Sequence, residues 1–359
     1  MVPYFLLIAL PVFVRTISKK YRFTSRGKLL FETSTGCIDV FMAMFLILLA
    51  LRGTNCGSDT KQYLRLFNEY REQSIYQLLQ GYDHELGYKV LNRIVGMVTD
   101  NYQIILILTS LMCVCPLWYF YKRESENNML TIALFLSVAP FTMYFSGIRQ
   151  AIAMSMGILA WYAVKDKKLW RFIAIVMIAI QFHFSAFMLF LLYPLRYARI
   201  TLKWLWVVVP CMIAVFIFRT PIFNFLLTFM HEEFGGAKAT GATSILLLLV
   251  MFSLYSYLLP EENSLDTDVI AMRNMLLLSV VIQIFAMMHP LSMRMNYYFL
   301  IFVPVLIPKI SNRSKKQFAR IARISVIVMT VYFMYYFLSN VINDNDTLNI
   351  FPYIPFWEN

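Results

Sequence analysis

Long runs of apolar residues recur along this chain and restrict its fold more than any other feature. A run of roughly 20 such residues crosses a bilayer as a helix, and shorter runs cross it when tilted or bundled. Charged residues make up only 14% of the 359 positions, against about 25% in soluble domains. We therefore predict an all-α polytopic membrane protein with about 12 (10–12) transmembrane helices in a single integral membrane domain, 1–359. The apolar runs lie at about 2–14, 35–51, 101–121, 129–146, 148–164, 169–182, 184–195, 204–218, 244–259, 268–288, 296–308 and 324–338.

Two strongly basic segments set the expected orientation. "RTISKKYRFTSRGK" and "KISNRSKKQFARIAR" each carry six basic residues and no acidic one. Basic loops stay in the cytoplasm, and both segments do so if the N-terminus starts outside. Residues 169–195 are divided at "QFHFSAF", because basic residues follow both ends. The net charge of +12 is thus explained by topology, and we expect no nucleic-acid partner.

Three polar regions then face outward: residues 52–100, residues 219–243 and the C-terminal tail. The first and largest contains two helix-like pieces, "DTKQYLRLFNEYREQ" and "HELGYKVLNRIVGMV". Each has an apolar face at helical spacing, so we expect amphipathic helices along the membrane interface in this extracytoplasmic loop. The two faces consist of Tyr63, Phe67 and Tyr70, and of Leu91, Ile94, Val95 and Val98.

Arginines stand at the expected outer ends of several helices. Arg149 and Arg294 begin inward-running helices, whereas Arg52 and Arg219 end outward-running ones. A helix N-terminus attracts anions, and a guanidinium binds a phosphate through two parallel hydrogen bonds. Snorkelling at the interface is the simpler interpretation for any one of them. Because few basic residues are expected outside, we predict that the set binds a diphosphate.

Two residues are candidates for a catalytic base. His183 falls at the expected outer turn of the 169–195 hairpin and can accept a proton near neutral pH; a structural turn histidine is the alternative. Asp59 follows Arg52 closely, and it is either a base, the ion-pair partner of Arg52, or a helix N-cap. Glu85 is a weaker carboxylate candidate that fits a helix start better. No metal-ligand spacing, nucleotide-binding motif or cofactor motif is found.

Several separated segments resemble the EpsG-type, Wzy-like polysaccharide polymerases of bacteria. "RGTNCGSDTKQYLRLF" resembles the family's R…G-[ST]-D-x-x-x-Y-x-x-x-F stretch, and "HELGYKVLNRIV" its E-x-G-[FY]-x-x-L segment. "FSGIRQAIAMSM" is similar to the R-Q-x-[IL]-A element, and "RMNYYF" to the late R-x-x-x-Y-F element. "KKLWRFIAIVMIAIQFHFSAF" resembles the K-x-x-x-F…FH-x-S-A segment. "TNCGSD" departs from the GTD-like form usual there.

The resemblance implies a glycosyltransferase that joins undecaprenyl-diphosphate-linked oligosaccharide repeat units, both as donor and as acceptor. We expect the enzyme to be metal-independent, because the arginines can neutralise the diphosphate and no acidic cluster typical of a divalent-cation site is found. The product would be a capsular, exopolysaccharide or O-antigen-type chain, made at the outer face of the bacterial cytoplasmic membrane. Membrane lipid, a flippase and a chain-length regulator are the further partners it implies. Besides the arginines, His183 and Asp59, it adds Gln150, Tyr63 and Tyr297 as substrate-binding candidates.

Two other functions remain open from the sequence. A flippase for the same lipid-linked units would also have about twelve spans and internal arginines, but its charges should line a path at mid-membrane depth. An O-antigen-ligase-like glycosyltransferase would use the same arginines and differ only in its acceptor. Only the series of motifs favours the polymerase over the second alternative.

Overall fold

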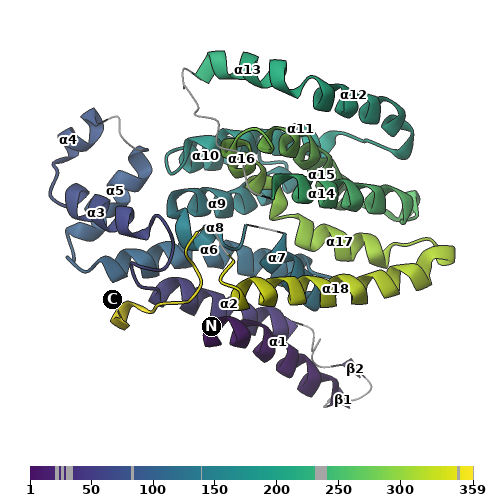
Figure 1. Ribbon diagram of the computed structural model, residues 1–359, viewed down its shortest axis with the longest axis horizontal. Coiled ribbons are helices and arrows are strands. Elements are labelled where there is room, and N and C mark those ends of the chain that lie inside the picture. Colours follow the sequence, from purple (N-terminus) through teal and green to yellow (C-terminus); the bar gives the residue numbers. More distant parts are fainter. Residues whose placement is uncertain are drawn as a thin grey trace. The chain divides into compact units, whose positions relative to one another are not determined.

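The computed structural model of the protein describes residues 1–20, 24–25, 28–29, 35–81, 85–138, 140–230, 241–345 and 348–358. Helices dominate this part of the chain (Figure 1). The one strand pair in these residues is a short antiparallel hairpin, β1 (Thr24–Ser25) with β2 (Lys28–Leu29). The chain divides into two compact units: Met1–Phe187 together with Ile327–Asn359, and Met188–Val326.

The first unit is a bundle in which α2 packs against α1 and α6, and α9 packs against α6 and α10. Asp39 near the start of α2 accepts hydrogen bonds from Trp118 Nε1 at 2.7 Å and from Lys122 Nζ near the end of α6. The two helices therefore run antiparallel, and the acid has partners that the sequence did not reveal. The helices of this unit are α1 (Val2–Lys20), α2 (Thr35–Leu51), α3 (Thr60–Tyr70), α4 (Ile75–Gln80), α5 (Leu86–Gly96), α6 (Tyr102–Glu124), α7 (Asn128–Ser137), α8 (Met143–Ser146), α9 (Ile148–Lys165), α10 (Leu169–Ile180) and the 3-10 turn η5 (Phe356–Glu358).

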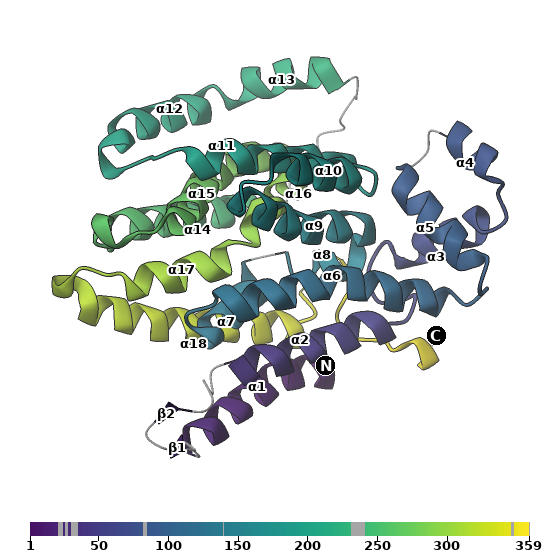
Figure 2. The same ribbon diagram turned by 180° about the vertical axis from the view of Figure 1, so that it is seen from behind.

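The expected outer loop of residues 52–100 folds into α3, α4 and α5, which gather at one end of α6 (Figure 2). On α3 the predicted face is buried, with Tyr63, Phe67 and Tyr70 inside. On α5 the structure buries Val95 of the predicted face together with Tyr88 and Asn92. The apolar side chains of Ile94 and Val98 are left exposed on that helix.

The second unit surrounds α15, which contacts α11, α14, α16 and α17. Buried amides tie the helices together: Asn296 Nδ2 donates to Gln283 Oε1 at 2.9 Å, and Gln283 Nε2 donates to the carbonyl of Ala242 at 3.1 Å. In Figures 1 and 2, α12 and α13 lie along the edge of this unit. Its helices are α11 (Leu192–Tyr197), η2 (Leu202–Trp204), α12 (Leu205–Ile217), α13 (Arg219–Met230), α14 (Ala242–Leu258), η3 (Glu262–Ser264), α15 (Thr267–Ala286), α16 (Pro290–Leu300), α17 (Val303–Asn312) and η4 (Lys316–Phe318). Two helices cross the boundary between the units, η1 (Phe184–Leu191) and α18 (Ala319–Ile342).

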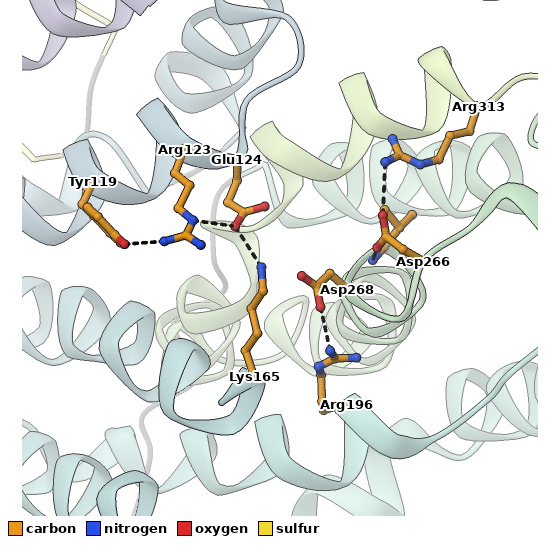
Figure 3. A network of polar contacts seen from close by, with 9 residues as sticks. Tyr119, Arg123, Glu124, Lys165, Arg196, Asp266, Asp268 and Arg313 are labelled. Carbon is orange, nitrogen blue, oxygen red and sulfur yellow. Dashed lines mark hydrogen bonds and ion pairs between the residues drawn. The ribbon is translucent and has the colours of Figure 1, made fainter. Parts of the chain in front are cut away.

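Basic residues expected in the cytoplasm are paired with acids. In the first unit, Lys165 of α9 lies 3.1 Å from Glu124 at the end of α6, and Arg123 points to the same carboxylate (Figure 3). In the second unit, Arg196 lies 2.7 Å from Asp268. Arg313 and Asp266, also in the second unit, form a similar pair at 3.1 Å. Within the basic segment 15–28, residues 21–23, 26 and 27 lie outside the described residues.

Helix length and composition identify only part of the expected spans among the described residues. Three described helices are long and apolar enough to cross a membrane: Tyr102–Glu124, Thr267–Ala286 and Lys316–Ile342. Counting two bent helix pairs as spans raises the number to five. The expected count of 10–12 is not confirmed, because many of the apolar runs form helices of 10–17 residues. One expected span, 129–146, is broken between α7 and α8, near Pro140, which disfavours a continuous helix.

Candidate active site

Arg149 occupies the first turn of α9, as the sequence predicted. Gly147 precedes the helix in the N-cap position, and a Cβ at Gly147 would lie 2.1 Å from the terminal methyl carbon of Met143. Nη1 of Arg149 donates a hydrogen bond to Oε2 of Glu85, which stands at the N-cap of α5. Both side chains are about one-fifth exposed, at 20% and 19%. The turn before α9 therefore places a partly buried ion pair next to the loop helices.

Glu85 also holds His183, which lies in the turn after α10. Nδ1 of His183 is 3.1 Å from Oε1 of Glu85, and the backbone N–H of Phe184 donates to the same oxygen at 2.9 Å. The N–H of Gly87 donates to the carbonyl of Gln181 at 2.7 Å. A Cβ at Gly87 would lie 2.7 Å from that carbonyl oxygen, so glycine permits the close approach of α5 to the end of α10.

The surroundings of Glu85 keep it ionised. Burial alone would raise its pKa, but hydrogen bonding with His183, the positive charge of Arg149 and the N–H of Phe184 together lower the pKa to about 2. A carboxylate with such a low pKa is a poor proton acceptor near neutral pH. When neutral His183 donates its Nδ1–H to Glu85, Nε2 becomes the acceptor and faces the remaining surroundings. The pair thus has the geometry of a carboxylate that orients a histidine base.

Tyr63 and Tyr88 complete the wall beside Arg149. Their rings meet edge to face with centroids 5.5 Å apart, and both side chains are buried. Burial raises the pKa of Tyr63, and the nearby Arg149 guanidinium opposes this rise. Tyr63 consequently remains a neutral phenol close to Arg149, which fits its predicted place in the site.

Asp59 lies beside the turn that precedes α9. Its backbone N–H donates to Oγ of Ser146 at 3.3 Å, and Ser58 Oγ donates to Asp59 Oδ1 at 2.9 Å. Gly57 has φ +98°, and a Cβ there would lie 2.5 Å from the carbonyl oxygen of Phe145. Asp59 stands at the N-cap of α3, yet its side chain makes no capping hydrogen bond. Asp59 therefore lies next to the turn that leads into α9 and Arg149. Its side chain forms no ion pair with any described residue.

The C-terminal tail fixes the loop that carries Asp59. Gly57 and Ser58 donate backbone hydrogen bonds to the carbonyls of Asn349 and Leu348, at 2.8 and 2.7 Å. Gly53 donates to the carbonyl of Ile354 at 2.8 Å. Residues near 52–58 are thus held between the tail and the turn before α9, which brings two of the three predicted outer regions together.

Arg52 differs from the other candidates because its side chain points into the bundle. It is 1% exposed, and Nη1 donates to the carbonyl of Leu49 at 2.6 Å. Cys113 and Tyr144 lie with it around a narrow gap in the packing. No ion pair joins Arg52 to Asp59 in the described part of the chain, so that interpretation of the sequence is not supported. Its role in binding a diphosphate remains a prediction.

The remaining candidates are Gln150 in the first unit, and Arg219, Arg294 and Tyr297 in the second. Gln150 lies on α9, and its side chain is buried, with 2% exposed. Arg294 and Tyr297 lie on α16, and Arg219 begins α13, all in the second unit. The predicted outer loop 219–243 begins with α13, and residues 231–240 lie outside the described residues. Binding of the substrate by Gln150, Tyr297, Arg219 and Arg294 stays a prediction.

Glu85 is the residue that reasoning from the sequence undervalued. The sequence predicts a helix-start residue, which is its backbone position, but its side chain makes the central contacts of the site. The E-x-G-[FY]-x-x-L resemblance contained the signal that could have raised its rank. Among the described residues, no group of three or more His, Cys, Asp and Glu side chains is arranged to hold a metal ion.

These features define an integral membrane protein of apolar helices with a charged cluster of Arg149, Glu85 and His183 among its loop helices. The chain belongs to the EpsG family, which it matches over residues 37–354. No curated protein and no solved structure matches the chain. Membership of this family indicates a glycosyltransferase-like function of the polysaccharide-polymerase type, as the sequence motifs predicted.

Proposed function

We propose that the protein joins undecaprenyl-diphosphate-linked oligosaccharide repeat units into a polysaccharide at the outer face of the bacterial cytoplasmic membrane. The observation that carries the proposal is the contact of Glu85 with both His183 and Arg149. It combines a histidine oriented for proton transfer with a guanidinium suited to a diphosphate. Multiple spans and an outward-facing 52–100 loop are parts of the same proposal.

The reaction is a displacement at an anomeric carbon. A hydroxyl oxygen of the acceptor glycan forms a bond to the anomeric carbon of the donor, while the bond from that carbon to the diphosphate oxygen breaks. The hydroxyl proton passes to Nε2 of His183. The electron pair of the broken bond leaves with the diphosphate, which stays attached to the donor's polyprenyl chain. Glu85 stabilises the imidazolium that forms, because it is already ionised and hydrogen-bonded to Nδ1.

Arg149 has two tasks in this scheme. It holds the Glu85 carboxylate in place, and it supplies positive charge as the diphosphate leaves. A guanidinium carries five N–H donors, so its contact with Glu85 does not by itself exhaust its capacity. Asp59 is the alternative base, and Tyr63 is positioned to contact a substrate sugar or phosphate near Arg149.

Reconstitution with purified lipid-linked repeat units tests the proposal directly. We expect a ladder of products on a gel, with free undecaprenyl diphosphate released at each step. Deletion of the gene in the source bacterium should cause single lipid-linked repeat units to accumulate on the outer face of the membrane. Accumulation on the inner face would indicate a flippase, and intact chains left unattached to their final acceptor would indicate a ligase.

A further inference from the structure

An apolar groove opens along the edge of the second unit between α12, α14 and α15. Its volume is about 310 Å³, at the lower end of the roughly 300–1,000 Å³ typical of ligand pockets. Val280 and Ile284 of α15 form a buried floor. Val209 and Ile213 of α12 form one wall and Val250 of α14 the other, and these three side chains are exposed.

One end of the groove is electrically neutral. Tyr257 lines this end, and the Arg273 guanidinium lies 4.0 Å from the centre of its ring. Arg273 donates to both carboxylate oxygens of Glu262, at 2.7 and 2.9 Å. The carboxylate therefore offsets the charge of the guanidinium, and this end offers no net attraction to an anion.

The opposite end carries a positive charge. Phe216 lines the groove there, and the Arg219 guanidinium lies 4.5 Å from its ring centre. Nη1 of Arg219 donates to the carbonyl of Phe216 at 2.7 Å. Arg219 forms no ion pair with a carboxylate in the described part of the chain. Just beyond it, Phe223 stacks with Phe285 and with His289, the N-cap of α16.

The groove is thus complementary to an amphiphile with a long apolar chain and an anionic head. From Leu205 to Phe216 it follows α12 for roughly 16 Å at 1.5 Å per residue. This length is about half of the roughly 30 Å hydrocarbon core of a bilayer. The groove is therefore long enough to hold the part of an extended chain that spans about half of the hydrocarbon core.

We propose that the groove binds the polyisoprenoid chain of the lipid-linked substrate, with the diphosphate at Arg219. This inference rests on the proposed function, which supplies a polyprenyl diphosphate as substrate. Lipid tails are as apolar as the groove, so transfer from the bilayer provides little driving force. Close packing around the methyl branches and the head-group charge provide the selectivity instead.

Photolabelling of the full-length protein in phospholipid nanodiscs tests the inference. The probe is a polyprenyl diphosphate of undecaprenyl length that carries a diazirine on its chain and no glycan. We expect labelled peptides from α12 and α14. Val209→Trp should reduce this labelling at least about fivefold, because it fills the groove. Val207→Trp is the matched control, since Val207 is exposed on the same helix outside the groove lining, and it should leave labelling nearly unchanged.

The head group is tested separately. Arg219→Ala should weaken labelling by the diphosphate probe and leave labelling by the corresponding neutral polyprenol unchanged. Labelling spread evenly over α18 and the other lipid-facing helices would overturn the inference. So would equal competition by excess phosphatidylglycerol, which would make the groove a general site for acyl chains.

The groove and the proposed function can fail independently, because the probe needs no glycan and no turnover. A protein that polymerises repeat units but is not labelled in the groove retains its function and loses this binding site. A protein labelled in the groove that forms no polymer retains a polyprenyl diphosphate site and loses the proposed polymerase reaction.

Discussion

Nδ1 of His183 lies 3.1 Å from Oε1 of Glu85, although 98 positions separate the two residues in the sequence. The contact joins the turn after α10 to the start of α5, and Arg149 reaches the other oxygen of the same carboxylate. If His183 is neutral and donates its Nδ1–H to this carboxylate, Nε2 is left as an acceptor, which is the arrangement that the proposed reaction requires.

Removing His183 should abolish polymerisation while donor binding is retained. Loss of a general base typically lowers a rate by about 10²–10⁴-fold, so we expect His183→Ala to form almost no product. His183→Gln should fail as well, since an amide cannot accept the proton. Asp59→Asn should keep partial activity. Product length on gels and donor binding by each variant are the measurements. An active His183→Ala protein beside an inactive Asp59→Asn protein would reverse the assignment.

Replacing Glu85 should make the protein less stable in a way that depends on pH. The pKa of Glu85 is lowered from 4.5 to about 2. Its stabilising contribution is therefore present above about pH 4.5 and is lost as the pH falls toward 2. The size of the shift corresponds to roughly 3 kcal/mol at most. Glu85→Gln should lower the melting temperature at pH 7, and the difference from the native protein should shrink in acid.

The matched control for this experiment is Glu72→Gln. Glu72 lies in the same loop, but its side chain is 75% exposed, so we expect little change in melting temperature at either pH. A difference between Glu85→Gln and the native protein that stays constant from pH 7 down to about 3 would exclude an ionised Glu85 as its cause. Thermal unfolding in detergent, followed by tryptophan fluorescence, measures both variants.

Arg149→Ala should stop chain growth without unfolding the protein. Loss of a hydrogen bond to a charged group costs about 1.5–3 kcal/mol, or roughly ten- to a hundred-fold in rate when the bond forms in the transition state. Arg149→Lys should restore little activity, because an ammonium lacks the planar fork. Arg65→Ala is the control, an exposed arginine on α3. Normal polymerisation by the Arg149→Lys variant would contradict diphosphate recognition by paired hydrogen bonds.

Arg294, in the second unit, is also predicted to bind the diphosphate through its guanidinium. Arg294→Ala should stop chain growth, because a charged hydrogen bond to the diphosphate is lost. Arg294 lies on α16, close to the N-terminus of the helix at Pro290, where an anion is also favoured by the helix. Arg294→Lys should again restore little activity. Polymerisation by the alanine variant at the native rate would remove Arg294 from the diphosphate-binding residues.

Local sequence patterns predicted the parts of the site that depend on neighbouring residues. The first turn of α9 at Arg149, the break of the chain at His183 and the buried face of α3 with Tyr63 follow from helical periodicity and from charge. Each of these is decided within a few residues. Periodicity therefore sufficed to locate Arg149, His183 and Tyr63 on their elements.

Local periodicity does not predict contacts between segments that are distant in the sequence. Glu85 became central only because Gly87 lets α5 approach Gln181 closely, and a helix-start position in the sequence does not show such an approach. Asp39 likewise gained Trp118 and Lys122 through antiparallel packing of α2 and α6. Counts of apolar runs also ignore where a run is interrupted, as near Pro140, so the expected number of spans stays a prediction.

The orientation of the loop can be measured by cysteine labelling in intact cells. Ser74 is a poor site, because its side chain forms a capping box with Gln77 at the start of α4. Asn68 is exposed on α3, so Asn68→Cys should react with a membrane-impermeant reagent from outside. Glu126→Cys, at the other end of α6, should react only after lysis. The opposite pattern would invert the proposed topology. Both variants are compared with the native protein, whose Cys115 and Cys211 are exposed.

Gly87→Ala should uncouple the candidate site while the helices remain folded. The added Cβ would lie 2.7 Å from the carbonyl oxygen of Gln181, so α5 must move away from the end of α10. Glu85 would then move away from His183, and the orientation of the base would be lost. We expect a loss of polymerisation, with the helical circular dichroism signal unchanged. Gly36→Ala is the matched control, because its Cβ would meet Val14 at an ordinary 3.4 Å. If Gly87→Ala polymerises as fast as Gly36→Ala, the close contact between α5 and α10 does not position the catalytic base.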